Sequence, residues 1–207
     1  MIIKKRKQNI IAFSSLFMIV IIVTSLIYLN YNYQFWTYLD TKNMVVLTEY
    51  KGQNIKGYRG RQIIVNKEFL PHITSLDKYA KEVELTIIIT NSYRPASQYL
   101  TNTVVEPVST SNHHVGCAID FNIKYKRKTY TSDEFHRDSL YKVPSNIKSF
   151  ISKIRNNRVL RWGGDFNTSD PVHIDYPMNI NNYKYYIKSK KLCTIDYNQA
   201  SLRWQFW

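Results

Sequence analysis

The chain has 207 residues and a formal net charge of +14, which is enough length for one membrane anchor and one domain of roughly 150–170 residues. A domain of that size buries a core without disulfide bonds. Two cysteines, Cys117 and Cys193, are too few for a disulfide-rich scaffold. We expect both to be buried free thiols, with a single bridge as the alternative. The positive charge indicates an anionic partner, whether nucleic acid, phospholipid or an acidic wall polymer.

The N-terminus predicts a membrane anchor. Residues 10–29 contain no charged side chain, and about twenty apolar residues are enough for a helix to cross a bilayer. The basic cluster Lys4–Lys7 predicts a cytoplasmic tail over residues 1–9. We therefore expect a single-pass signal-anchor at residues 10–30 of the inner (cytoplasmic) membrane, with a cleaved signal peptide as the alternative. Either way the folded part is extracytoplasmic or periplasmic, and nucleic acid is not an expected partner.

The remaining chain is expected to form a juxtamembrane linker at residues 31–60 and one extracytoplasmic domain at residues 61–207. Helices are predicted where apolar residues recur every three or four positions, and strands where β-branched residues run together. Because the two do not alternate regularly, we expect an α+β fold with a small antiparallel sheet and flanking helices. The predicted elements are a strand at 44–48, a helix at 67–83, strands at 85–90 and 116–123, a basic hairpin at 124–128, a helix from 144, strands at 158–162 and 172–176, and a helix at 183–190.

The strand predicted at 116–123 carries the first candidate site residue. Alternate side chains of a strand share one face, so one face is expected in the core and the other on the floor of a cleft. His113, on the loop that enters the strand, can fold back beside Asp120. The core set is Cys117, Ile119 and Phe121, and the cleft set is Gly116, Ala118 and Asp120.

A second histidine completes a metal-ligand set. In the strand predicted at 172–176, His173 and Asp175 are expected to face away from the core. Catalytic zinc commonly takes three ligands drawn from histidine and carboxylate, with a fourth position left for water. His113, Asp120 and His173 supply such a set. Asp175 is then either a partner of a ligand or a solvated strand residue.

Two further residues are candidates for catalysis. Asp170, in a turn fixed by Pro171, is expected to act as the general base. Arg94, at the end of the 85–90 strand, is expected either to stabilise an oxyanion or to bind a substrate carboxylate. Spacing alone leaves a structural interpretation open, since a lone strand histidine is more often structural and Asp-Pro more often only marks a turn. The histidines not expected to be ligands are His72, His114 and His136.

Residues 111–120 resemble the S-x-H-x-x-G-x-A-x-D signature of the zinc peptidases that include D-alanyl-D-alanine carboxypeptidases and L-alanyl-D-glutamate endopeptidases, and they fill every fixed position. Residues 92–94 are similar to an upstream Ser-Tyr-Arg element of that family, and residues 162–173 to a downstream Trp-Gly-Gly element with its acidic residue and histidine. The resemblance implies zinc ligands at His113, Asp120 and His173, a base at Asp170, a substrate-polarising Arg94, and supporting or substrate-contacting roles for Ser111, Tyr93, Trp162, Gly163 and Asp165.

Together with the predicted anchor at residues 10–30, the resemblance implies a membrane-anchored zinc peptidase that acts on peptidoglycan stem peptides. Asp170 and the segment 162–165 are more similar to the endopeptidases, so we expect cleavage between L-Ala and D-Glu. Phe166 and the position of Pro171 depart from the family pattern near the substrate pocket. The alternatives are a D-alanyl-D-alanine carboxypeptidase, or a non-catalytic wall-binding or scaffold component of an envelope or secretion machine. Such a machine is also a candidate partner if the protein is an enzyme.

Overall fold

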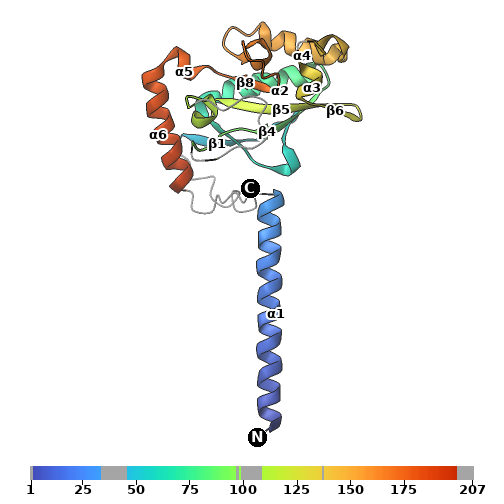
Figure 1. Ribbon diagram of the computed structural model, residues 1–207, viewed down its shortest axis with the longest axis vertical. Coiled ribbons are helices and arrows are strands. Elements are labelled where there is room, and N and C mark those ends of the chain that lie inside the picture. The colour runs from blue at the N-terminus through green and yellow to red at the C-terminus, as the bar shows by residue number, and fades with distance from the viewer. Residues whose placement is uncertain (1, 34–45, 97, 99–108, 137, 200–207) are drawn as a thin grey trace.

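The computed structural model describes residues 2–33, 46–96, 98, 109–136 and 138–199. One long helix, α1 (Ile2–Tyr33), lies outside a folded domain built around a six-stranded sheet (Figure 1). The predicted α+β class is confirmed. Among the side chains that the structure describes, no helix is both long and apolar enough to cross a membrane. The transmembrane span predicted at residues 10–30 is therefore not supported by the structure.

The main sheet has the strand order β2-β4-β5-β8-β7, and β6 pairs with β5. All pairs along it are antiparallel except β2 with β4, which is parallel. A parallel pair needs a long crossover, and here the chain from β2 to β4 passes through β3 and α2. The strands are β2 (Ile55–Gly57), β4 (Thr86–Asn91), β5 (Ala118–Tyr125), β6 (Lys128–Tyr130), β7 (Arg161–Trp162) and β8 (His173–Asp175).

The folded part begins earlier than predicted. A separate two-stranded sheet pairs β1 (Leu47–Tyr50) with β3 (Ile63–Asn66), so β1 and β2 both lie within residues 31–60, which were assigned to a linker. The strand expected at 44–48 is β1, shifted towards the C-terminus, and residues 44–45 lie outside the described residues. Strand β2 has three residues, which is too short for a clear local signal, and its partner in the sheet is β4.

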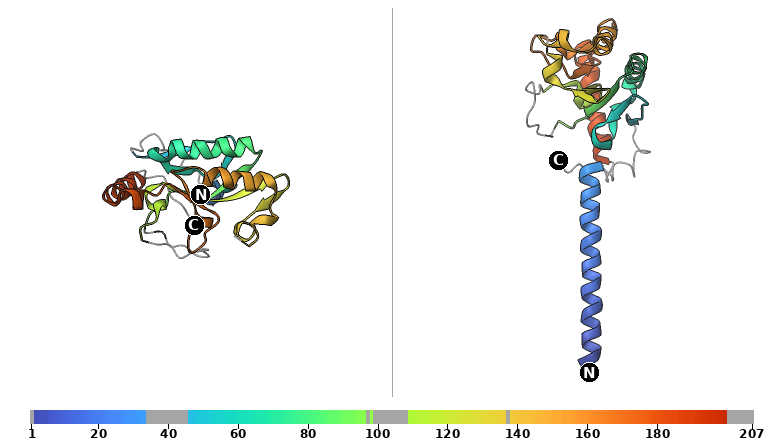
Figure 2. Two further views of the ribbon diagram at one scale, coloured as in Figure 1. Left: turned by 90° about the horizontal axis from the view of Figure 1, so that it is seen from above. Right: turned by 90° about the vertical axis from the view of Figure 1, so that its right-hand side faces the viewer.

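Helices cover the sheet and complete the core. Figure 2 shows α2 (Leu70–Glu82) and α4 (Ser145–Arg155) side by side, and they contact each other in the core. Both predicted apolar stripes are confirmed, since the inward side chains of each helix are buried. The shorter helical elements are η3 (Tyr58–Gly60), η4 (Lys67–Phe69), η5 (Asn112–Val115), α3 (Ser132–Phe135), η6 (Leu140–Lys142), η7 (Gly163–Asp165) and α5 (Met178–Asn181).

The last described helix, α6 (Tyr183–Gln199), lies along one edge of the domain beside β1 and η5 (Figure 1). It is longer than the predicted 183–190 segment because its second half is also anchored. Asp196 accepts hydrogen bonds from the backbone N–H groups of Val46 and Leu47. Cys193 is fully buried, and its thiol lies 3.6 Å from the carbonyl oxygen of Val115.

Both cysteines are buried and free, as predicted. The Cys117 thiol also lies 3.6 Å from the Val115 carbonyl oxygen. Burial raises the pKa of both thiols, that of Cys193 to about 12. Because the thiolate is the reactive form, both side chains are expected to be inert at neutral pH.

Candidate metal centre

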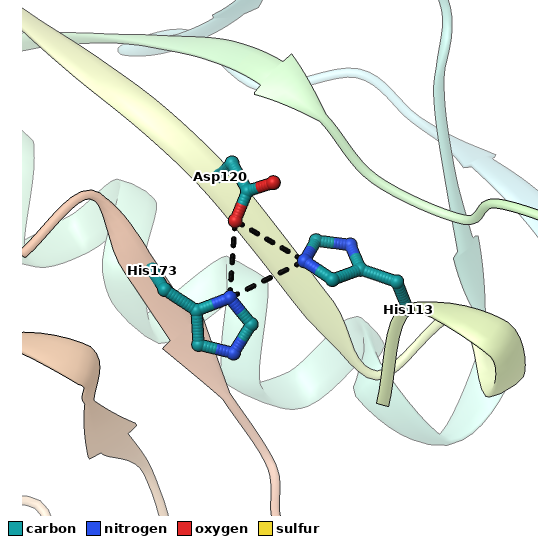
Figure 3. A group of neighbouring side chains, drawn as sticks. All are labelled: His113, Asp120 and His173. Carbon is teal, nitrogen blue, oxygen red and sulfur yellow. Dashed lines mark hydrogen bonds and ion pairs between the residues drawn. The ribbon is translucent and has the colours of Figure 1, made fainter. Parts of the chain in front are cut away.

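Three predicted ligands converge where β5 meets β8. The register places Asp120 directly opposite His173 on the neighbouring strand, and η5 brings His113 to the same point (Figure 3). The Asp120 Oδ1 atom lies 3.1 Å from His113 Nε2 and 3.0 Å from His173 Nδ1, and the two nitrogens are 3.2 Å apart. Among the described residues, this is a group of donor atoms that could hold a metal ion.

The turn around η5 explains how His113 reaches this point. Ser111 caps the helix, since its hydroxyl accepts a hydrogen bond from the His113 N–H at 3.4 Å. Gly116 ends the helix in the left-handed conformation, with φ of +66°, and a Cβ there would lie 2.6 Å from the backbone nitrogen of Asn66. Gly116 is therefore a turn residue that precedes β5, and its predicted place on a cleft floor is wrong. The core alternation beyond it, at Cys117, Ile119 and Phe121, is confirmed.

Hydrogen bonds fix which nitrogen each histidine presents. His113 Nδ1 lies 2.7 Å from the carbonyl oxygen of Ser92, so Nδ1 carries the proton and Nε2 presents a lone pair towards Asp120. His173 presents Nδ1 to the cluster, while its Nε2 faces Asp175 at 3.8 Å. Two imidazole nitrogens and one carboxylate oxygen match the donor set of a catalytic zinc ion.

The charges of the cluster favour a cation at its centre. Burial alone lowers the pKa of His173, but hydrogen bonds to Asp120 and Asp175 outweigh it and raise the pKa to about 10. Burial raises the pKa of Asp120, yet the two histidines hold it well below its usual range. The carboxylate and the imidazoles of the cluster thus stabilise each other's charged forms. Metal binding needs deprotonated ligands, so a divalent cation bound by the same donor atoms would release protons.

Asp175 supports the second histidine. It is 2% exposed and accepts hydrogen bonds from Arg161 Nε at 2.9 Å, Arg161 Nη2 at 2.6 Å and Asn112 Nδ2 at 2.6 Å. Burial raises its pKa, but contacts with His173 and Arg161 outweigh this and lower it to about 2. Of the two interpretations left open, the solvated one is wrong. Arg161, the cross-strand partner of Asp175, and Asn112 were not predicted to belong to the site.

Asp175→Asn is expected to weaken zinc binding by about 10–100-fold, the usual effect of removing a carboxylate behind a ligand histidine. The amide keeps the volume but loses the charge that orients His173 and balances Arg161. Competition with a chromogenic chelator measures the affinity. Asp165→Asn is the matched control, because Asp165 forms its own Arg pair, with Arg155 at 2.7 Å. Equal affinities of Asp175→Asn and wild type would show that Asp175 does not support the site.

Asp170 lies beside the cluster on a tightly held turn. Its N–H donates to the Gly163 carbonyl at 2.9 Å, and its own carbonyl accepts from the His173 N–H at 3.0 Å. Burial raises the pKa of the Asp170 side chain, and the charge of Asp120 adds to this while the nearby histidines oppose it. A partly buried carboxylate next to, but outside, the ligand set has the surroundings of a general base.

The sequence match covers this same region. Residues 106–176 match a family model described as D-alanyl-D-alanine carboxypeptidase. The matched segment, less than half of the chain, contains all three ligand candidates and Asp170. No curated protein matches the chain. Over this segment the chain is similar to the M15 peptidases, which supports a peptidase-type hydrolase, and the histidine–aspartate cluster is consistent with zinc.

Two glycines allow the end of β7 to approach the Asp170 turn. A Cβ at Gly163 would lie 2.2 Å from the Asp170 carbonyl oxygen and 2.9 Å from His173 Cβ. A Cβ at Gly164 would lie 2.3 Å from the Trp162 ring, which in turn donates to the Pro171 carbonyl at 2.8 Å. Trp162 and the two glycines therefore pack against the backbone of the turn at Asp170 and Pro171. Asp165, the next residue, is exposed and pairs with Arg155 rather than with the cluster.

Gly163→Ala is expected to lower the free energy of unfolding by about 1–3 kcal/mol, the usual cost of overpacking a tight contact. The atom in the way is a backbone oxygen, which cannot swing aside as a side chain can. Denaturant unfolding of the zinc-free protein measures the change. Thr168→Ala, at an exposed position of the same loop, is the control and should leave the midpoint unchanged. A midpoint for Gly163→Ala equal to wild type would contradict the packing described.

Arg94 and Tyr93 of the Ser-Tyr-Arg element lie in different surroundings. Arg94 is 4% exposed, and its N–H donates to the His113 carbonyl at 3.1 Å. Burial lowers the pKa of its guanidinium, and the charge of Asp120 acts in the opposite direction. Arg94 thus adds a positive charge near the cluster. Tyr93 instead packs into a second core cluster, with Leu47, Ile64 and Cys193.

The other described histidines lie outside the cluster, as predicted. His72 stacks on Tyr176, with ring centroids 4.9 Å apart, and His136 lies 3.5 Å from Asp138. His114 is buried beside His113, and its burial lowers its pKa to about 4. Phe166, one of the departures from the family pattern, lies against the His173 ring with centroids 5.9 Å apart. The departure from the family pattern at position 166 therefore lies beside a candidate metal ligand.

Proposed function

We propose that this protein is a zinc-dependent peptidase that hydrolyses the stem peptides of peptidoglycan, between L-Ala and D-Glu. The observation that carries the proposal is the convergence of His113 Nε2, Asp120 Oδ1 and His173 Nδ1 on one point. The family match over the same residues supports the substrate class. Asp170 and the Trp162–Asp165 segment support the choice of bond, by their similarity to the endopeptidases.

In this proposal the ligands of a zinc ion are His113, Asp120 and His173, and neighbouring residues have separate catalytic roles. Bound zinc would polarise a substrate carbonyl and lower the pKa of water. Asp170 takes a proton from the attacking water and passes it to the leaving amine, a role that suits a partly buried carboxylate outside the ligand set. Arg94 either stabilises negative charge on the substrate oxygen or binds a substrate carboxylate.

A D-alanyl-D-alanine carboxypeptidase is the second candidate, because the matching family model carries that description. The two activities leave different products, so digestion of purified muropeptides followed by mass analysis separates them. Our proposal predicts products that begin with D-Glu and no free D-Ala. Release of D-Ala with an intact L-Ala–D-Glu bond would establish the second candidate instead.

We further propose that the domain works outside the cytoplasm, attached to the inner membrane through residues 10–30. The basic cluster Lys4–Lys7 and the uncharged run that follows support this. Each side chain from Leu16 to Val23 is apolar and between 43% and 59% exposed on α1. Membrane fractionation with carbonate extraction tests the attachment, with a chain lacking residues 1–30 as control. Full-length protein found only in the soluble fraction would contradict it.

A further inference from the structure

The turn that carries His113 is held in part by the last two helices that the structure describes. The three residues before Asn112 each accept a hydrogen bond at their backbone carbonyl oxygen, and each donor is a side chain of α5 or α6. The pairs are Asn179 Nδ2 with Thr110 at 2.8 Å, the Tyr186 hydroxyl with Ser111 at 3.1 Å and Lys190 Nζ with Ser109 at 3.2 Å. Both helices follow residue 176, where the family match ends. The turn of the first ligand therefore contacts a part of the chain beyond that match.

Asn179 makes two further hydrogen bonds, both to Asn112, the residue before His113. The backbone N–H of Asn179 donates to Asn112 Oδ1 at 3.1 Å, and Asn179 Oδ1 accepts from Asn112 Nδ2 at 2.9 Å. Because a backbone N–H can only donate, it identifies which end of the Asn112 amide is the oxygen. Asn112 is 2% exposed, and a buried amide needs partners for both its oxygen and its nitrogen. Asn179 supplies a partner for each, so it fixes the orientation of the Asn112 side chain.

The same Asn112 side chain reaches towards the second ligand histidine. Its Nδ2 also donates to Asp175 Oδ2 at 2.6 Å, and that oxygen lies 3.8 Å from His173 Nε2. A side-chain amide nitrogen carries two hydrogens, and here one is directed to Asn179 and the other to Asp175. The contacts therefore run from Asn179 through Asn112 and Asp175 to His173. They connect the turn of one ligand histidine to the strand of the other.

We infer that Asn179 is a positioning residue of the metal centre, which holds the turn bearing His113 in place relative to His173. This role rests on the proposed function and deepens it. Each contact in the series joins two protein groups, so the fold itself can hold the two histidines near each other. Ligands that are already held in place lose less conformational freedom when a metal binds. Loss of the Asn179 side chain should therefore weaken metal binding beyond its effect on the fold.

The zinc affinity of full-length Asn179→Ala, measured by competition with a chromogenic chelator, tests this role. The substitution removes the bonds to the Thr110 carbonyl and to Asn112 Nδ2, and it keeps the backbone N–H that donates to Asn112. We expect zinc binding about tenfold weaker than wild type, the lower end of the range for residues behind a ligand, because Asn179 acts through Asn112. Asn179→Ser, which also lacks both bonds, should show the same loss and serves as a second variant.

Asn182→Ala is the matched control, because it makes the same change three residues further along the chain. Asn182 Oδ1 accepts a hydrogen bond from the Tyr185 N–H at 3.0 Å, at the start of α6. Loss of such a helix cap lowers stability, so the unfolding midpoint of zinc-free Asn182→Ala should fall while its zinc affinity stays at the wild-type level. The visible spectrum of cobalt-loaded protein, which depends on the geometry of the ligands, should change in Asn179→Ala and not in Asn182→Ala.

A double-mutant cycle tests whether Asn179 acts through Asn112. Asn112→Ala should weaken zinc binding at least as much as Asn179→Ala does. Residues in one hydrogen-bond network are coupled, so adding Asn179→Ala to Asn112→Ala should cause little further loss. Losses of affinity that simply add would contradict the series of contacts from Asn179 to His173.

The outcomes separate the positioning role from the proposed function. Wild-type zinc affinity in Asn179→Ala and Asn179→Ser, or a loss no larger than that of Asn182→Ala, would overturn the role of Asn179 and leave the peptidase proposal standing. If wild-type protein binds no zinc, the proposed function is overturned and the positioning role with it.

Discussion

Asp170→Asn is expected to lower kcat for stem-peptide hydrolysis by about 10²–10⁴-fold, the range in which a general base contributes, while zinc content stays at the wild-type level. The amide has nearly the same shape, and the backbone hydrogen bonds that hold the turn to Gly163 and His173 do not involve the side chain. The substitution therefore removes the proton acceptor without removing a ligand. Single-turnover kinetics on a purified muropeptide, with metal analysis of the same sample, measures both quantities.

The control for this variant is Asp165→Asn, which makes the same chemical change at a surface pair with Arg155. It should retain wild-type kcat. If Asp170→Asn keeps activity within a few-fold of wild type, another group is the base. If it loses zinc together with activity, Asp170 belongs to the ligand set, and the division between ligands and base is wrong.

Asp120→Asn is expected to lose zinc, with a decrease in affinity larger than the 10–100-fold predicted for Asp175→Asn. Asp120 is the carboxylate of the cluster, and its Oδ1 contacts both histidines. Without it, the ligand set has two imidazoles, no negative charge and the Arg94 guanidinium nearby. Zinc bound per chain after dialysis measures the loss, and muropeptide hydrolysis should disappear in parallel.

His72→Gln is a suitable control for the loss of zinc, since His72 stacks on Tyr176 away from the cluster. It should bind zinc as wild type does. If Asp120→Asn retained a full complement of zinc, the ligands would have to lie elsewhere, and the site built from η5, β5 and β8 would be wrong.

Local patterns predicted the elements that carry the site. The alternation from Cys117 to Phe121 has a period of two, and the inward side chains are buried as expected. The stripe of Ile147, Phe150, Ile151 and Ile154 has the helical period, and all four are buried on α4. In such segments, local preference and tertiary packing favour the same structure, so the sequence alone is informative.

The errors occur where distant parts of the chain decide the structure. The parallel pairing of β2 with β4 has no local signal. The extension of α6 depends on hydrogen bonds from Val46 and Leu47 to Asp196, and these residues are about 150 positions apart in the chain. Gly116 was assigned to a strand because alternation does not reveal a left-handed residue at the start. Its role follows from the approach of Asn66, which only the folded chain shows.

Within the site, side chains with distinctive chemistry were easier to find than their supports. His113, Asp120 and His173 were predicted from residue type and spacing, and the structure brings them together. The Ser92 carbonyl that sets the His113 tautomer is a backbone group, which no sequence pattern identifies. The role of Asp175 stayed open because strand alternation predicts on which face of the sheet a side chain lies. It does not predict whether other residues bury that face.

We expect zinc held by His113, Asp120 and His173 to make this chain a stem-peptide hydrolase. The most direct measurement is muropeptide hydrolysis by purified protein before chelation, after removal of metal, and after one equivalent of zinc is restored. We predict that chelation abolishes hydrolysis and that zinc restores it in wild type but not in Asp120→Asn. Hydrolysis that persists in the metal-free protein, or that zinc restores equally in Asp120→Asn, would contradict this role of zinc.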